Sequence, residues 1–364
     1  MALTHGSLTS VFPLQDLPAA ARKARRGMAC PWERQHEKND ARMPMQFGPF
    51  TVAIPLVLAP MAGVSDRVFR ALCLRHGAAW APSEMTSADA ELRLDLRGEI
   101  TPQVVQIAGA DPAEMVDAAQ AAVALGAAAI DINMGCPVKR VCHRLAGSAL
   151  LRDEPLVARI LHAVVQAVAV PVSLKTRTGW SPANRNAVRV ARIAEDAGIA
   201  WLSLHGRTRE CAYQGEAEYD TIAAVKAAVG IPVIANGDIT SPAKARAVLA
   251  HTGADGLMIG RAAQGDPWIF SRIRHHLETG ETPAPPAPAD VLATMREHVA
   301  GLHAFYGAVP GLRIARKHVG WYARHLSQGA ALRALFNTID DAEAQLAFLA
   351  RQQQRLEDQQ GAAA

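Results

Sequence analysis

The sequence lacks a long hydrophobic segment. The best candidate, residues 160–172, is interrupted by His162, Gln166 and Pro171, and no run reaches the ~18 apolar residues that a membrane-spanning helix needs. The N-terminus also lacks the charged stretch and following apolar stretch of a secretory leader. We therefore expect neither a membrane protein nor a secreted one.

Cysteine is also scarce. The 364 residues contain five cysteines and no Cys-x-x-Cys pair, which excludes a disulfide framework. Hydrophobic residues make up 50% and charged residues 20%, a balance that excludes a disordered or collagen-like chain. We expect a folded protein in a reducing, cytoplasmic setting.

The charge is small in total, a formal net +4, but it is unevenly distributed. Residues 45–290 hold 23 basic residues against 24 acidic ones, whereas residues 291–335 hold six basic residues and the single acid Glu297. A neutral body followed by a basic segment indicates a polyanionic partner.

Short apolar runs alternate with amphipathic helical segments through the middle of the chain. Eight strands in about 240 residues, each followed by a helix, predict a (β/α)₈ TIM barrel over residues 45–282. The alternative, a doubly wound sheet, would carry Gly-x-Gly-x-x-Gly after its first strand, and residues 58–63 do not match it. The strands are expected at residues 56–59, 79–81, 104–107, 129–132, 172–174, 201–204, 233–235 and 257–259.

The flanking segments predict further parts. Residues 1–44 are expected to be a flexible extension, residues 283–290 a proline-rich linker, residues 291–350 a helical domain, and residues 351–364 a tail. Within residues 312–326, apolar residues recur at helical spacing and form one stripe. The stripe is Leu312, Ala315, Val319, Tyr322 and Leu326, and the remaining surface is expected to carry Arg313, Arg316, Lys317, His318, Arg324 and His325.

Polar residues follow nearly every predicted strand, at the end of the barrel where the active sites of such proteins lie. Gly237 and Gly260, with Arg261, predict a phosphate site after the last two strands, although these glycines could instead serve tight turns. Lys175 could be a Schiff-base amine or a cation that stabilises charge on a bound ring. His205 is equally compatible with a ligand and with a core histidine.

Cys136 lies between a glycine and a proline directly after a predicted strand. This setting indicates an acid or a nucleophile, and Cys142 is the competing thiol. The residues expected to favour its thiolate are Lys139, Arg140 and Arg144.

Six segments together resemble the tRNA-dihydrouridine synthase family, over about residues 46–345. They are residues 59–66, 131–137, 174–180, 205–209, 234–239 and 258–265. The sequence around Cys136 and after Arg261 is most similar to that of the bacterial B-type branch, which is associated with uridine 17 of the tRNA D-loop.

The resemblance implies an FMN-dependent enzyme in which NADPH reduces the flavin and the flavin passes a hydride to C6 of a uracil. Cys136 would be the general acid at C5, and no metal or obligate protein partner is expected. The implied FMN-binding residues are Pro60, Met61, Ala62, Gln106, Lys175, His205, Asn236, Gly237, Asp238, Gly260 and Arg261. Asn133 and Arg177 would contact the target base, and Arg313, Arg316 and Lys317 would contact tRNA.

Three other functions are compatible with parts of the sequence. A flavin barrel acting on a free pyrimidine or a dihydroorotate-like molecule would leave the basic segment unexplained. An aldolase without flavin would use Lys175 as its amine. A non-catalytic RNA-binding protein would leave Lys175 and Cys136 without a role.

Overall fold

The computed structural model describes residues 44–88, 103–138, 141–142 and 145–361. The expected N-terminal extension, residues 1–44, thus lies outside the described residues except for Pro44. Across the described part of the chain, no helix is both long and apolar enough to cross a membrane.

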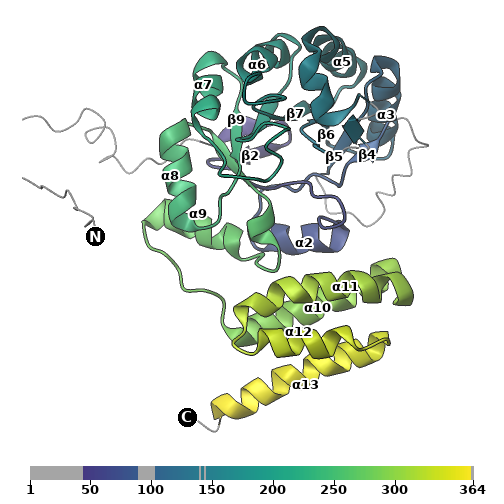
Figure 1. Cartoon of the computed structure of the whole chain (residues 1–364), viewed down its shortest axis with the longest axis vertical. Coiled ribbons are helices and arrows are strands. Elements are labelled where there is room, and N and C mark those ends of the chain that lie inside the picture. Colours follow the sequence, from purple (N-terminus) through teal and green to yellow (C-terminus); the bar gives the residue numbers. More distant parts are fainter. Residues whose placement is uncertain (1–43, 89–102, 139–140, 143–144, 362–364) are drawn as a thin grey trace, which may run out of the picture. The chain divides into compact units, whose positions relative to one another are not determined.

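Eight strands of the described residues form one parallel sheet in the order β3-β10-β9-β8-β7-β6-β5-β4. Helices cover the outside of this sheet (Figure 1). The predicted TIM barrel is confirmed. The strands are β3 (Leu56–Leu58), β4 (Thr86–Ser87), β5 (Val104–Ala108), β6 (Ala129–Met134), β7 (Val172–Arg177), β8 (Trp201–His205), β9 (Val233–Asn236) and β10 (Gly256–Ile259).

The helices of the barrel begin where the sequence supplies caps. In α8 (Pro242–Thr252), the Ser241 hydroxyl accepts from the Lys244 N–H, proline occupies the first turn, and Gly253 ends the helix in the left-handed region. The others are α2 (Arg67–Arg75), α3 (Pro112–Ala124), α5 (Glu154–Ala167), α6 (Ala187–Asp196), α7 (Asp220–Ala228) and α9 (Ile269–Thr279).

The second predicted strand, residues 79–81, is wrong in position. Trp80 forms only a single parallel bridge to Val57, and the strand in this place is β4, five residues further along. Pro82 interrupts the run, because proline has no N–H for a ladder hydrogen bond. The segment between them joins the two edges of the barrel, since the Ser83 N–H donates to the carbonyl of Val104 on β5 at 2.9 Å.

The inside of the barrel changes from apolar to polar along the strands. At the amino ends, the hairpin of β1 (Met45–Phe47) and β2 (Phe50–Val52) packs into the barrel, and Phe50 stacks on Trp80 with ring centroids 4.6 Å apart. Because side chains alternate along a strand, residues further along the same inward face lie toward the carboxyl ends. They are Gln106, Asp131, Asn133, Ser173, Lys175, Arg177, Ser203, His205 and Asn236.

The C-terminal part is helical and has its own core. Its first helix begins inside the expected linker, because Pro288 suits the first turn of a helix, and its last helix continues beyond residue 350 into the expected tail. The elements are α10 (Pro288–Tyr306), α11 (Ala308–Tyr322), the 3₁₀ turn η4 (Ala323–His325), α12 (Gly329–Asn337) and α13 (Ala342–Gly361).

The predicted apolar stripe of α11 holds for its central residues, since Ala315, Val319 and Tyr322 are fully buried. The prediction that His318 lies on the surface is wrong. His318 is fully buried and contacts His298 of α10, with ring centroids 4.4 Å apart. The physical reason is that α11 packs against the barrel as well as its own domain, so it buries more than one stripe.

Two glycines let the helical domain approach the barrel closely. A Cβ atom at Gly301 of α10 would lie 2.6 Å from Cγ1 of Val68 on α2. A Cβ atom at Gly265, which has φ of +71°, would lie 2.4 Å from the backbone carbonyl carbon of Trp321 on α11. Larger residues at these positions would therefore push the two parts away from each other.

Candidate active site

The predicted strand-end residues meet at one mouth of the barrel. Strand register places Asn133 beside Lys175, and His205 beside both Arg177 and Asn236. The carboxyl ends of parallel strands share an edge, so these residues of β6, β7, β8 and β9 contribute to the same site. The structure thus brings the inward-facing members of the predicted set together.

Lys175 has an ammonium group with no hydrogen-bond or ion-pair partner within the described residues. Burial, followed by the positive charge of Arg177, lowers the pKa of Lys175 to about 8. The amine therefore still carries its proton at pH 7. It can donate hydrogen bonds to a negatively charged group in the barrel mouth.

Gln106 and Asn133 form a chain of amides across two strands. The Asn133 amide Nδ2 donates to Gln106 Oε1 at 2.9 Å. Asn133 Oδ1 accepts from the backbone N–H groups of Gly135 at 3.0 Å and Cys136 at 2.9 Å. Asn133 thereby fixes the start of the loop that carries Cys136.

Cys136 is partly exposed at the barrel mouth. Burial is the largest influence on this thiol and raises its pKa, so it is protonated at neutral pH and suits an acid better than a thiolate nucleophile. The residues expected to favour the thiolate, Lys139, Arg140 and Arg144, lie outside the described residues.

The competing thiol, Cys142, is buried below the same loop. Its Sγ lies 3.7 Å from the Cys136 carbonyl oxygen and 3.6 Å from the Ser148 hydroxyl. That hydroxyl also donates to the Cys136 carbonyl at 2.8 Å. Cys142 therefore packs against the backbone that holds Cys136, and of these two thiols Cys136 is the more exposed.

Arg177 is buried and joins two loops of the site. Its Nε donates to the Gly135 carbonyl at 2.7 Å, and its Nη1 donates to the carbonyls of Thr208 at 3.1 Å and Ala212 at 3.0 Å. These bonds tie the Cys136 loop to the loop after β8. Any contact of Arg177 with a base would be made by a guanidinium that is already fixed in place.

His205 is held in its neutral form. Burial, and then the charges of nearby Arg177 and Lys175, lower its pKa well below the usual value. Arg207 Nη1 lies 3.4 Å from His205 Nε2, and arginine can only donate, so Nε2 accepts. The other ring nitrogen, Nδ1, is consequently the protonated one and can act as a donor.

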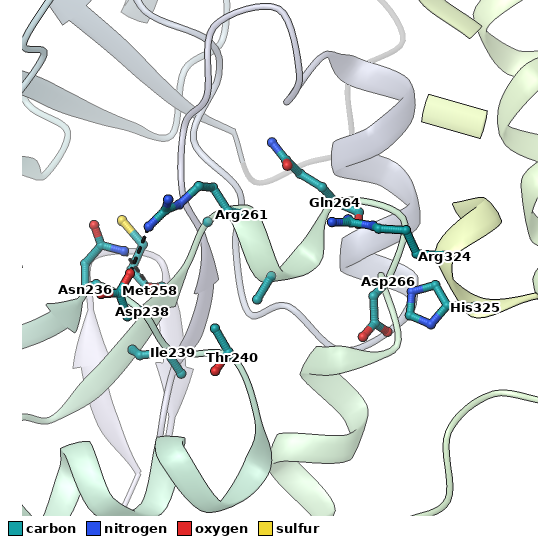
Figure 2. Close-up of a pocket in the computed structure, with 13 residues that line it drawn as sticks. Asn236, Asp238, Ile239, Thr240, Met258, Arg261, Gln264, Asp266, Arg324 and His325 are labelled. Atoms are coloured by element: carbon teal, nitrogen blue, oxygen red, sulfur yellow. Dashed lines mark hydrogen bonds and ion pairs between the residues drawn. The ribbon is translucent and has the colours of Figure 1, made fainter. Parts of the chain in front are cut away.

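The predicted phosphate residues line a cavity of about 460 Å³. Gly237 and Asp238 both have positive φ, of +127° and +45°, at the end of β9. The Asp238 carboxylate binds Arg207 at 2.6 Å and Arg261 at 2.8 Å, so its side chain orders two cations. Figure 2 shows the pair of Asp238 and Arg261. An anion here would be contacted by the backbone of Asp238 and by Arg261, which both line the cavity, whereas the buried Arg207 fixes the Asp238 side chain.

The loop after β3 supplies the remaining predicted residues. Pro60 and Met61 are partly exposed and Ala62 is exposed. The Met61 N–H donates to the Ser65 hydroxyl at 2.7 Å, which fixes the turn. A Cβ atom at Gly260 would lie 3.7 Å from Met61 Sδ, so this loop borders the phosphate cavity.

Sequence reasoning missed Tyr213 in the loop after β8. Its side chain is 56% exposed, and the guanidinium groups of Arg177 and Arg261 lie 5.6 and 5.1 Å from its ring centroid. An exposed aromatic ring between two cations is a platform on which a base can stack. The available signal was an aromatic residue in a strand-end loop rich in charge.

Comparison with known proteins agrees with this geometry. The dihydrouridine synthase (Dus) family model matches residues 57–359. The chain belongs to the dihydrouridine synthase family. Enzymes of this family are flavin-dependent oxidoreductases.

Individual relatives place the chain in the B-type branch of the dihydrouridine synthases. The protein named tRNA-dihydrouridine synthase B from Pseudomonas putida is 57% identical over 87% of this chain and 98% of its own. The Pseudomonas aeruginosa protein of the same name is 58% identical over 83% and 94%, and that of Vibrio parahaemolyticus is 55% identical over 84% and 97%.

The residues of this dihydrouridine synthase fit a flavin ring. The Ser203 hydroxyl is fully buried on the inward face and has no partner within the described residues. Strand register places it beside Lys175, whose ammonium is also free. Unsatisfied buried polar groups are costly, so two neighbouring ones match a ligand with carbonyl and N–H groups along one edge.

The three cations predicted for tRNA differ in their surroundings. Arg313 is exposed and has no partner within the described residues. Arg316 Nη2 binds the carbonyl of Ile339 at 3.0 Å and the Asp340 carboxylate, both in its own domain. Lys317 donates to the Gly63 carbonyl in the loop after β3. The described contacts thus leave Arg313 free, whereas Arg316 and Lys317 already hold the fold.

Proposed function

We propose that this chain is a tRNA-dihydrouridine synthase that uses FMN and NADPH to reduce the C5–C6 double bond of a D-loop uridine, at position 17. One observation carries the proposal: the barrel mouth holds both a protonated thiol, that of Cys136, and an ammonium without a hydrogen-bond partner in the described part of the chain, that of Lys175. The names of the relatives support the tRNA substrate, and the resemblance of the motifs to the B-type branch supports the position.

The phosphate cavity supports FMN as the flavin. Two residues with positive φ and the cation Arg261, which line the cavity, suit the phosphate of a mononucleotide. When bound and reduced, FMN supplies the hydride for C6 of the uracil. Lys175 would donate to the ring edge that carries negative charge, which is why an unpaired cation is needed there.

Cys136 would complete the reduction. Addition of hydride at C6 leaves an electron pair at C5, and the thiol hydrogen of Cys136 neutralises it, so the product gains one hydride and one proton. The raised pKa keeps that proton on sulfur until it is needed. Asn133 and the stacked ring of Tyr213 would orient a base that has left its helix, as recognition of a splayed base requires.

Mapping dihydrouridine in tRNA tests this function. A strain that lacks the gene should lose dihydrouridine at position 17, and the wild-type gene should restore it while Cys136→Ala should not. The purified Cys136→Ala variant should keep its FMN. Retention of dihydrouridine at position 17 in the deletion strain, with no redundant enzyme present, would refute the assignment. Equal turnover of free uridine and tRNA would instead indicate a pyrimidine reductase.

The same purified enzyme tests the choice of reductant. We expect NADPH to reduce the flavin faster than NADH at equal concentration, measured by loss of flavin absorbance. We also propose a cytoplasmic location, because the substrate is tRNA and the cysteines of the described residues are unpaired.

A further inference from the structure

A carboxylate lies beneath the amide chain of the site. Asp131, on β6, is 1% exposed and faces the inside of the barrel two residues before Asn133. Its Oδ2 accepts from Gln106 Nε2 at 2.6 Å, and its Oδ1 accepts from the Ser173 hydroxyl at 2.6 Å.

The hydrogen bonds of this chain all run in one direction. Two backbone N–H groups, of Gly135 and Cys136, occupy the Asn133 oxygen, so the Asn133 nitrogen must face Gln106. Gln106 must then accept with its oxygen and donate with its nitrogen, which requires an acceptor beyond it. An ionised carboxylate is such an acceptor and cannot donate.

The surroundings keep Asp131 ionised. Burial raises its pKa to about 6, while its hydrogen bonds from Ser173 and Gln106 and the charge of Lys175 act in the opposite direction. At pH 7 the carboxylate is therefore still negatively charged. A protonated or amide group at this position could present a donor to the Gln106 nitrogen, which also donates, and the chain would then lose its acceptor at this end.

We propose that Asp131 is a positioning residue: its carboxylate supplies the acceptor that the Gln106–Asn133 chain requires at its far end and, through Asn133, holds Cys136 in place. The inference rests on the proposed function for its catalytic meaning. Each amide nitrogen uses one hydrogen within the chain and keeps the other. Gln106 and Asn133 therefore meet a bound ring or base as donors, and the Cys136 loop stays anchored through its backbone.

The test uses the full-length, FMN-loaded protein and two readouts. Alkylation of Cys136 by iodoacetamide, followed by mass spectrometry of its peptide, reports the position of the loop without catalysis. Rapid mixing of the reduced enzyme with tRNA reports the rate of flavin reoxidation. We expect Asp131→Asn to slow reoxidation by about tenfold or more, because misplaced reacting groups cost this much, and to change the alkylation rate severalfold. The control, Ser173→Ala, removes a donor to the same carboxylate. At pH 8, well above the Asp131 pKa, the carboxylate keeps its charge, and both rates should stay near those of wild type at the same pH.

A double substitution supplies the rescue. Asp131→Asn combined with Gln106→Glu moves the negative charge one position along the chain, where it can accept from both neighbouring amides. The alkylation rate of Cys136 should then return to the wild-type value, even though a charge beside the flavin weakens FMN binding. If the single variant does not fold, this double variant decides alone, by the same comparison with wild type.

Two results would overturn the proposal. One is wild-type alkylation and reoxidation in Asp131→Asn, and the other is a double variant whose alkylation rate still differs from wild type. Failure of the proposed function looks different. In that case the unmodified protein itself would show no reoxidation by tRNA, while the alkylation series would still decide whether Asp131 positions Cys136.

Discussion

Lys175 and Cys136 are both expected to act in their protonated forms, and burial is the largest influence on the pKa of each group. Burial destabilises the charged form of each group, so it lowers the pKa of the amine and raises that of the thiol. The order of the two pKa values is thereby reversed, with that of the lysine now below that of the thiol. Both protons are present at neutral pH, and the lysine is the first to lose its proton as the pH rises.

The pH profile of Lys175 can be predicted from this. The rate of flavin reoxidation by tRNA should fall as the pH rises through about 8, because the amine then loses the charge that stabilises the ring. Lys175→Arg should abolish this fall, since arginine stays protonated. Lys175→Ala should lower the rate by roughly 10²-fold at pH 7, the usual cost of a lost oxyanion donor. Stopped-flow absorbance between pH 6.5 and pH 9 measures both effects, and identical profiles for wild type and Lys175→Arg would contradict the assignment.

At the scale of elements, the junction of α2, α10 and α11 buries two imidazoles. Phe69 of α2 stacks on His298 with centroids 5.6 Å apart, and His298 contacts His318. Burial lowers the pKa of His298 to about 3 and that of His318 well below its usual value. Both rings are therefore neutral in the folded protein at neutral pH.

This junction should make the fold sensitive to acid. Unfolding restores the ordinary histidine pKa of about 6.5, so the unfolded chain binds protons first and stability is lost as the pH falls below 6.5. Each imidazole contributes a slope of up to about 1.4 kcal/mol per pH unit. His318→Phe should flatten the dependence of the unfolding free energy on pH, measured by urea denaturation between pH 5 and pH 7. His162→Phe, at an exposed position, is the control, and an equal change in both variants would contradict the prediction.

The sequence allowed the strands to be predicted where apolar runs were followed at once by polar residues, as at Lys175 and His205. It failed where one residue changed the local geometry, as Pro82 does in the second strand. His318 was predicted on the surface because one apolar stripe accounts for packing against one neighbour. The helix α11 packs against two, α10 and α2 of the barrel. Asp131 was read as part of an apolar run, and only the three-dimensional register shows that it accepts from Gln106.

At the scale of the whole molecule, the barrel and the helical domain are joined at the edge of the site. Lys317 of α11 binds the loop after β3, and Arg324 Nη2 donates to the Gln264 carbonyl after β10 at 2.9 Å. Figure 2 shows Arg324 and His325 on the side of the cavity opposite Asp238. Two cations of the basic segment, residues 291–335, thus hold the helical domain on the barrel.

By its described contacts Arg313 is free to contact tRNA, whereas Arg316 is bound within its own domain, and this difference predicts how each residue affects the salt dependence of tRNA binding. Arg313→Ala should weaken binding and reduce the slope of log K against log salt by about 1, as expected for one lost phosphate contact. Arg316→Ala is the matched control. It should lower the melting temperature, because it breaks the bonds to Ile339 and Asp340, while the salt slope stays unchanged. Filter binding at several salt concentrations, with thermal melts, separates these effects, and an unchanged slope in Arg313→Ala would contradict the proposed contact.

The close approach at Gly265 also limits how such enzymes can be recombined. Its hydrogen leaves room for the backbone of Trp321, and the neighbouring carbonyl of Gln264 is the acceptor for Arg324. A helical domain grafted from a relative would have to pack correctly against these surfaces before it could bind RNA. A folded chimera must therefore exchange α11 and the loop after β10 together, so that a new helical domain brings with it part of the wall of the cavity beside Asp238.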